Sequence, residues 1–462
     1  MNFYLSMFMF CLGITFLFRS LWSSILNAFL GFFPRQRVCQ VIFLLALVCN
    51  LYILRNDNWM EYTGSVTLFV LTVLLLLASF LALIAEPMVR RIVNFGSRNY
   101  WFFALPNFIF LWTIGFWLLI WSYIGEVEDL GPCLPDDKLG VLCDISNAED
   151  LIATPDQRFL IAPEFGGIGP HLVPEVHQTG RILMIDLDRG QVQPAVIEYG
   201  ENIWGDRGCL RHKETLFSPH GMDLRRRHDN LWQLAVVNHF PKESVEMFEL
   251  VKNDEQWGLV WRGCISVPQV NYLNDISLAS DGSFFVSHMY DTDFSANDAL
   301  VASLFKNVTG YAMRWDSENG FSQVPSTEGA HPNGIIYDDV RGLLFVAYTF
   351  GDKIDAINML SGKVESSFKL NSPDNIVLKD GTLWITSWDH SIQDMVSCKG
   401  KTPCTLPFSI YALEPNTLNL VKKWRFHHTT TGLPTVALPT NQGVWIGSSR
   451  SDRLVHFDLE WP

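Results

Sequence analysis

The sequence predicts an all-β six-bladed β-propeller preceded by an α-helical membrane domain of about four transmembrane helices. Three observations support this fold class. The composition changes near residue 125, the first part contains four apolar runs, and one short pattern of polar and apolar residues returns six times in the second part. The 462 residues of the chain are enough for two domains, which we place at 1–125 and 126–462.

Charge divides the chain at the same place. Residues 1–125 contain seven Arg, no Lys and three acidic residues, a net charge of +4, and the whole chain carries −14, so residues 126–462 carry −18. An acidic domain lacks the basic surface that binds nucleic acids, so we expect no nucleic-acid partner. The charge suits an extracytoplasmic domain or one that holds divalent cations.

The apolar runs predict transmembrane spans near 8–33, 38–54, 65–85 and 101–124. The run 65–85 is long enough to cross about 30 Å of hydrocarbon as a helix. The run 101–124 has Trp101 and Trp121 near its ends, as is common at membrane interfaces. Arg19 interrupts the first run, which is therefore either one long helix or a short re-entrant pair.

The loops between these runs predict the orientation. The segments PRQR (34–37) and VRRIVNFGSR (89–98) are basic, whereas RNDNWMEYTG (55–64) is not. The positive-inside rule places both basic loops in the cytoplasm and the large domain on the extracytoplasmic side. We therefore predict a multi-pass integral membrane protein, with the lipid bilayer as a partner.

The cysteines of residues 126–462 are compatible with that location. They number six, an even set that permits disulfides without fixing their pairing. Cys398 and Cys404 are close enough in sequence to staple one loop.

A repeated pattern predicts the propeller. A polar residue or pair, an apolar triplet, a turn with Asp or Gly and a second apolar run follow one another in six segments, which start at Ala148, Pro219, Leu273, Pro332, Pro373 and Pro434. A propeller blade of four strands takes about 40–50 residues plus loops. Six copies in residues 126–462 fit six blades, whereas a β-sandwich needs only about seven to nine strands.

The polar residues directly before each expected first strand are candidate ligands: Glu149-Asp150, His220, Asn274-Asp275, Asn333 and Asp374-Asn375. The innermost strands line the central channel of a propeller, so these side chains should converge at one mouth of it. Carboxylate and carboxamide oxygens are the ligands that calcium takes. Any one pair is explained equally well as a turn former, but their recurrence predicts a calcium site.

The same segments resemble the paraoxonase (serum arylesterase/lactonase) family, within the calcium-dependent six-bladed propellers that include gluconolactonases and strictosidine-synthase-like proteins. The resemblance covers nearly all of 140–460. It rests on the order of the motifs AEDL, SPHGMDL, LAVVNHF with ESVEMFELV, YLNDISL, HPNGIIY, and SPDNIVL with LWITS.

This resemblance implies two calcium ions and a histidine dyad. It implies that Glu149, Asn274, Asn333, Asp374 and Asn375 bind a catalytic calcium ion. It assigns Asp150, Asp275 and the backbone carbonyl of Met222 to a structural calcium ion, and the dyad to His220 and His239. The implied activity is hydrolysis of a small-molecule ester or lactone, in which calcium polarises the carbonyl, His220 takes the proton of the attacking water and His239 orients His220.

The sequence departs from the family in three places. The chain has about four predicted spans instead of one apolar segment. The last strand, LVHFDL, lacks the cysteine that ties it to the start of the propeller, so strand pairing or other cysteines must close the ring. The segment after LWIT reads SWDH, where the family often has a free cysteine.

An alternative function class remains open at this stage. The propeller can be a non-enzymatic, calcium-stabilised binding or chaperone module with a membrane-protein partner, because a propeller fold does not fix a function. Serine-hydrolase, zincin and NTPase motifs are absent from the sequence. The acidic run YDTDFSAND (290–298) lacks the glycine of an EF-hand loop, so we expect a solvated surface loop there.

Overall fold

The computed structural model of the chain describes residues 9–11, 14, 73, 100–123, 131–165, 179–211, 217–254, 256–389, 405–427 and 429–459. The chain forms two compact units, Met1–Gly125 and Glu126–Pro462.

The first unit contains helix α6 (Tyr100–Tyr123), so the helical part of the prediction for 101–124 is confirmed. Among the described residues, no helix has the length and apolar character needed to cross a membrane. The membrane-spanning part of that prediction is therefore not confirmed. The spans predicted at 8–33, 38–54 and 65–85 lie almost wholly outside the described residues.

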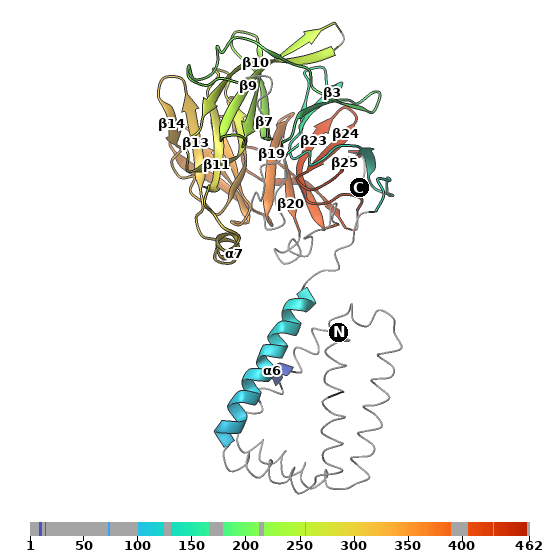
Figure 1. Cartoon of the computed structure of the whole chain (residues 1–462), viewed down its shortest axis with the longest axis vertical. Helices are drawn as coiled ribbons and strands as arrows, with labels where there is room; N and C mark the ends of the chain where they lie inside the picture. Colours follow the sequence, from blue (N-terminus) through green and yellow to red (C-terminus); the bar gives the residue numbers. More distant parts are fainter. Residues whose placement is uncertain are drawn as a thin grey trace. The chain divides into compact units, whose positions relative to one another are not determined.

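The second unit is a six-bladed β-propeller (Figure 1). Blade 1 contains β2 (Ile152–Ala153), β3 (Phe159–Pro163), β4 (Ile182–Asp186) and β5 (Gln191–Pro194). Blade 2 contains β7 (Pro219–Arg226), β8 (Trp232–Asn238), β9 (Ser244–Asn253) and β10 (Gln256–Ser266), and β6 (Ile197–Tyr199) pairs parallel with β10. Blade 3 contains β11 (Asn271–Leu278), β12 (Phe284–Asp291), β13 (Tyr311–Asp316) and β14 (Gly320–Gln323).

Blade 4 contains β15 (Pro332–Asp338), β16 (Leu343–Tyr348), β17 (Lys353–Asn358) and β18 (Lys363–Lys369). Blade 5 contains β19 (Pro373–Lys379), β20 (Thr382–Trp388), β21 (Phe408–Leu413) and β22 (Leu420–Phe426). Blade 6 contains β23 (Pro434–Thr440), β24 (Gly443–Ser448), β25 (Arg453–Phe457) and, from the start of the unit, β1 (Gly140–Cys143). The predicted number of blades is confirmed.

Apolar side chains between the blades hold the ring together. Six buried clusters each combine residues of two neighbouring blades, and together they cover all six junctions of the ring. At the junction of blades 2 and 3, for example, Val237 and Met247 pack in one cluster with Phe284 and Val286. Burying such side chains contributes about 1.5–3 kcal/mol each, so the core of this fold lies between its sheets.

The ring closes by strand pairing, as the missing cysteine of the last strand requires. Strand β1 pairs antiparallel with β25, with Gly140 opposite His456. A disulfide joins Cys133 to Cys143 at the end of β1, and a second disulfide joins Cys209 to Cys264 within blade 2. Cys398 and Cys404 lie outside the described residues.

A buried arginine strengthens this closure. The side chain of Arg453 on β25 is 1 % exposed and donates hydrogen bonds to the carbonyl oxygens of Gly131 and Pro132, both at 3.1 Å. The side chain of Arg453 therefore holds the backbone of the segment before β1 against the last blade.

The acidic run at 290–298 contains the solvated loop that we expected, because residues 292–295 form neither helix nor strand and are mostly exposed. The run also contains the end of β12 and the first turn of α7 (Ala296–Phe305), which lies at one rim of the propeller (Figure 1). Ser295 and Asp298 form a capping box, in which the Ser295 hydroxyl accepts from the Asp298 N–H and the Asp298 carboxylate accepts from the Ser295 N–H. The sequence analysis did not predict this helix start, because it considered only the number of acids.

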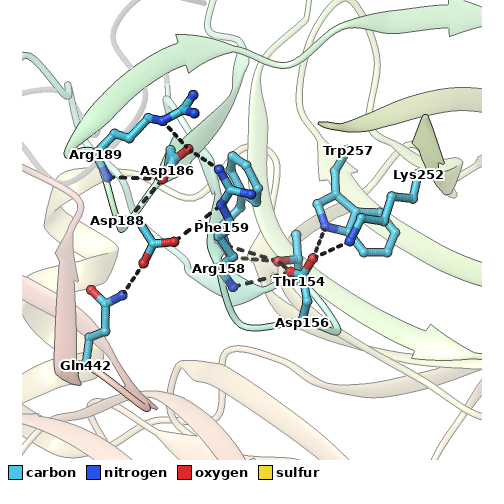
Figure 2. A network of polar contacts seen from close by, with 10 residues as sticks. All are labelled: Thr154, Asp156, Arg158, Phe159, Asp186, Asp188, Arg189, Lys252, Trp257 and Gln442. Carbon is cyan, nitrogen blue, oxygen red and sulfur yellow. Dashed lines mark hydrogen bonds and ion pairs between the residues drawn. The ribbon is translucent and has the colours of Figure 1, made fainter. Parts of the chain in front are cut away.

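A polar network joins blade 1 to the blades on both sides (Figure 2). Asp156, in the turn between β2 and β3, accepts hydrogen bonds from Lys252 Nζ and Trp257 Nε1 of blade 2, both at 2.9 Å. Asp188, just after β4, accepts one from Gln442 Nε2 of blade 6 at 3.0 Å.

Part of the stability of the folded chain should depend on the ionised carboxylate of Asp156 and should therefore be lost in acid. Burial opposes ionisation of Asp156, but hydrogen bonds from Thr154, Lys252 and Trp257 outweigh it and lower the pKa of Asp156 to about 2. Because the unfolded-state pKa is about 3.9, this stabilisation is complete above about pH 4 and is lost as the pH falls towards about 2. We expect Asp156→Asn to destabilise the chain at pH 7, but only modestly, because the side chain is partly exposed. The variant should also lose less stability than the wild type as the pH falls from about 4 to about 2.

Denaturation of the full-length chain across this pH range measures the effect. Asp254→Asn, at an exposed turn of blade 2, is the matched control and should keep the wild-type profile. An Asp156→Asn profile parallel to the wild-type profile would contradict the prediction.

Candidate functional site

The inner strands of blades 2 to 6 carry a β-bulge, and in blades 2 to 5 the bulge lies at the predicted polar residues. The register of the inner strand against the second strand shifts between Pro219 and Met222, Leu273 and Ile276, Pro332 and Ile335, Pro373 and Ile376, and Pro434 and Val436. A bulge frees residues from the ladder and re-aims their side chains. The polar residues of blades 2 to 5 therefore lie inside the first strands. The prediction that they precede these strands is wrong there and holds only for Glu149 and Asp150 of blade 1.

Glycines next to these bulges let the inner strands approach closely. A Cβ atom on Gly334 would lie 2.5 Å from the carbonyl oxygen of Asp374, and one on Gly221 would lie 2.5 Å from that of Asn274. No side chain fits at these distances. The backbones of neighbouring blades therefore touch where the polar residues lie, which brings those residues together.

The five residues predicted to bind the catalytic calcium each have a buried side-chain oxygen that lacks a hydrogen-bond partner among the described residues: Glu149 Oε2, Asn274 Oδ1, Asn333 Oδ1, Asp374 Oδ1 and Asn375 Oδ1. All five residues are at most 4 % exposed. Four of them line one cavity of about 50 Å³, and Asn375 contacts Glu149. Since an unpaired buried acceptor is costly, these oxygens fit a bound cation.

The amide nitrogens of the three asparagines explain why their oxygens stay unpaired. Asn375 Nδ2 donates to Glu149 Oε1 at 3.0 Å, and Asn333 Nδ2 donates to Thr349 Oγ1 at 3.0 Å. Asn274 Nδ2 lies 3.8 Å from Met289 Sδ. Each amide therefore uses its nitrogen for a protein contact and keeps its oxygen available.

The charges at this site are unfavourable without a cation. Burial raises the pKa of Glu149 well above its ordinary value, and the nearby carboxylates of Asp374, Asp150 and Asp275 raise it further. Burial likewise raises the pKa of Asp374 well above its ordinary range. Among the described residues, no group of three or more His, Cys, Asp and Glu side chains could hold a metal ion. The predicted set instead combines two carboxylates with three carboxamides, a donor set that suits calcium better than zinc.

The residues predicted to bind the structural calcium lie together at a second cavity of about 320 Å³. Asp150 accepts a hydrogen bond from the N–H of Met222 in the next blade at 2.7 Å, and Asp275 accepts one from the N–H of Ile335 in the next blade at 2.8 Å. Burial raises the pKa of Asp150 to about 7 and that of Asp275 well above its ordinary value. The carboxylates therefore connect neighbouring blades, and the role of the Met222 carbonyl as a ligand stays a prediction.

The two predicted histidines are in direct contact. His220 Nδ1 lies 2.8 Å from His239 Nε2, and His220 Nε2 lies 3.5 Å from Glu149 Oε2. Ring stacking fixes both imidazoles, since Phe165 lies parallel to His220 with centroids 4.1 Å apart and Tyr272 lies parallel to His239 at 4.3 Å. Burial lowers the pKa of His220 well below its ordinary value, and His239 lowers it further. Burial and the neighbouring ring therefore favour the neutral form of His220, which has a lone pair on one ring nitrogen.

The sequence analysis missed the walls of this cavity. Tyr290, Phe294, Phe350 and Trp388 line it together with His331. These residues come from the ends of β12, β16 and β20 and from the loops around them, and they share no repeated motif. Nothing in a single sequence distinguishes them from core aromatic residues.

The sequence analysis also missed Glu243, whose Oε1 lies 2.7 Å from His239 Nδ1. The segment HFPKE did contain a signal, because it places an acid four residues after the histidine, between two apolar runs.

A protein-family model described as Arylesterase matches residues 146–397, a range that covers more than half of the chain and contains every predicted site residue. No curated protein sequence matches the chain.

Similar solved structures include a luciferin-regenerating enzyme, at 10 % identity and a TM-score of 0.41, covering 69 % of this chain and 94 % of that one. They also include the calcium-binding protein regucalcin from Agrobacterium tumefaciens, at 9 % identity and a TM-score of 0.39, covering 70 % of this chain and 94 % of that one. A putative oxidoreductase (glucose dehydrogenase) from Thermus thermophilus is similar at 12 % identity and a TM-score of 0.38, covering 72 % of this chain and 99 % of that one.

Proposed function

Since the chain belongs to the arylesterase family, we propose that its propeller is a calcium-dependent hydrolase of aryl esters or lactones. The observation that carries this proposal is the set of five buried oxygens that lack a hydrogen-bond partner among the described residues, one of which, Glu149 Oε2, lies 3.5 Å from His220 Nε2. Glu149, Asn274, Asn333, Asp374 and Asn375 would hold the catalytic ion. Asp150 and Asp275, with Met222, would hold the second, structural ion.

The chemistry divides between the ion and the two histidines. Calcium bound at the five oxygens would polarise the ester carbonyl and stabilise the negative charge that develops on its oxygen. His220 takes a proton from a water molecule at its Nε2 while the water oxygen forms a bond to the carbonyl carbon. His239 accepts a hydrogen bond from His220 Nδ1 and stabilises the imidazolium. The ester C–O bond then breaks, and His220 returns the proton to the leaving oxygen.

The cavity walls favour a flat, apolar substrate. Tyr290, Phe294, Phe350 and Trp388 line a small space, and four of the predicted calcium ligands line the same space. Aromatic walls bind apolar rings well, and a few polar groups then fix the orientation. We therefore favour aryl esters and small lactones over long-chain esters.

Hydrolysis assays on the purified full-length chain test the proposal. We expect turnover of aryl esters and small lactones with calcium present, and loss of turnover in Asn274→Ala, because one of the five oxygens is removed. Asn319→Ala, at an exposed turn of blade 3, is the control and should retain full activity. A chain that hydrolyses no member of the panel would favour the binding-module alternative. Activity unchanged in Asn274→Ala would refute the calcium mechanism.

We also propose that the first unit anchors the chain in a membrane and that the propeller lies on the extracytoplasmic side. The two disulfides of the propeller support this location, because such bonds persist in oxidising compartments. A propeller digested by protease added to the cytoplasmic face of sealed vesicles would contradict it.

A further inference from the structure

The hairpin between β8 and β9 places an acid beside the second histidine of the pair. Asn238 and Ser244 are the last paired residues of this hairpin, so His239 and Glu243 occupy the two ends of the loop and face each other. Glu243 Oε1 lies 2.7 Å from His239 Nδ1. Both side chains are at most 10 % exposed, so water does not screen their interaction appreciably.

Contacts on several sides hold this loop in place. Asn238 Nδ2 donates to Ser244 Oγ at 3.0 Å and so braces the hairpin. The backbone carbonyl of Glu243 accepts from the Val267 N–H at 3.3 Å. Its second carboxylate oxygen, Oε2, accepts from the Leu273 N–H of blade 3 at 3.4 Å. The carboxylate of Glu243 therefore faces His239 in a fixed position.

The hydrogen positions of both imidazoles follow from this contact. An ionised carboxylate only accepts hydrogen bonds, so His239 Nδ1 carries the hydrogen and His239 Nε2 has a lone pair. His220 Nδ1, 2.8 Å away, must then donate to His239. His220 Nε2 is left with a lone pair on the side of Glu149 and the cavity.

We propose that Glu243 is a positioning residue, which fixes the tautomers of His239 and His220 so that the second nitrogen of His220 can accept a proton from water. The contacts run from Glu243 through His239 to His220. Glu243 touches neither the substrate nor the cavity. It acts through His239, and its negative charge also stabilises the imidazolium that forms when His220 gains the proton.

Loss of the carboxylate permits the opposite arrangement. Without Glu243, His239 can carry its hydrogen on Nε2 and donate to His220 Nδ1. His220 then holds its hydrogen on Nε2, and the group facing the cavity changes from an acceptor to a donor. The base is lost although every ring stays in place. A neutral amide at position 243 removes the charge but keeps one acceptor oxygen.

Kinetics of Glu243→Gln and Glu243→Ala test the proposal, which rests on the proposed hydrolase function. We expect kcat to fall about 10–100-fold, the usual range for groups that orient a catalytic or metal-binding histidine, with the larger loss in the alanine variant. KM, calcium affinity and thermal stability should stay near the wild-type values. Asp291→Asn is the matched control. Asp291 Oδ1 lies 3.2 Å from Nε2 of His288, a buried histidine three residues earlier in the chain, and this pair has no role in the proposed mechanism. Its activity should not change.

A readout independent of turnover separates this inference from the proposed function. In the ¹⁵N NMR spectrum of histidine-labelled chain, the wild type should show both His220 and His239 protonated at Nδ1, and Glu243→Ala should show Nε2 protonation. Identical tautomers in wild type and Glu243→Ala would overturn the inference, and so would an unchanged kcat. A chain without hydrolytic activity would refute the proposed function, and the spectra would still decide whether Glu243 sets the tautomers.

Discussion

Removal of calcium is expected to abolish hydrolysis and to lower the thermal midpoint of the propeller by about 5–10 °C. A ligand present at about a thousand times its dissociation constant stabilises a folded chain by about 4 kcal/mol, and 1 kcal/mol moves the midpoint of a large domain by about 2 °C. In this propeller the effect has a specific cause. Glu149, Asp150, Asp275 and Asp374 are buried within reach of one another, and without a cation their charges oppose folding.

The direction in which one substitution changes the thermal midpoint tests this explanation. With calcium, Asp374→Asn should lower the midpoint and weaken binding of the ion, because it removes one of the two charged ligands. In a chelator the same variant should be more stable than the wild type, because burial and the nearby carboxylate of Asp150 oppose the charge of Asp374 more than the hydrogen bond from Asn333 favours it. Asp355→Asn is the matched control. Asp355 is equally buried, but it accepts hydrogen bonds from Lys353 Nζ at 2.6 Å and Ser367 Oγ at 2.5 Å, so its loss should destabilise the chain under both conditions.

Differential scanning calorimetry with and without chelator makes these measurements. A wild-type midpoint that does not respond to calcium would contradict the metal site, and so would an Asp374→Asn variant that is less stable than the wild type in chelator.

Replacement of His220 by Gln is expected to lower kcat for ester hydrolysis about 10²–10⁴-fold, the range that a positioned general base contributes. Its ring is buried against Phe165, its Nδ1 contacts His239, and its Nε2 is the nitrogen that faces Glu149 and the cavity. Gln approximates the size of the ring but cannot take a proton near neutral pH. KM should change much less, because the aromatic walls and the calcium ligands remain.

Two further measurements make this result specific. Calcium affinity of His220→Gln should match that of the wild type, which shows that the loss is not caused by a missing ion. His288→Gln replaces a second buried histidine outside the pair and should retain activity. If His220→Gln retained its kcat, the histidine pair would have no catalytic role and the binding-module alternative would gain support.

The predicted ring is confirmed and the predicted ligands lie together in it, because both outcomes depend on repetition. Asn274-Asp275 and Asp374-Asn375 recur at equivalent places of different blades, and a circular fold brings equivalent places together. The bulges could not be predicted in the same way, because a register shift depends on pairing with the second strand, which single-strand patterns do not encode. Apolar residues such as Ile276 and Ile376 mark where regular pairing resumes.

Contacts that occur only once in the fold could not be predicted from the repeated sequence pattern. Glu243 reaches His239 only because the β8–β9 loop folds back on itself, and Tyr290, Phe294 and Phe350 meet only after several loops are placed. The α7 helix was missed for a related reason. Its capping residues, Ser295 and Asp298, were present in the sequence, but acidic composition alone did not distinguish a helix start from a loop.

The way in which the ring closes has a consequence for biosynthesis. Every predicted ligand of the catalytic ion lies between Glu149 and Asn375, so a ribosome has made all of them before it reaches blade 6. The hydroxyl of Thr435 in blade 6 nevertheless donates to the carbonyl of Glu149 at 2.5 Å, and apolar side chains of blade 6 separate blade 5 from blade 1. A nascent chain that stops before residue 434 thus contains all the predicted ligands but lacks the strands of blade 6 that pack between blades 5 and 1. If the proposed calcium site exists, a chain that ends before residue 434 should not bind the ion, although all the predicted ligands are present.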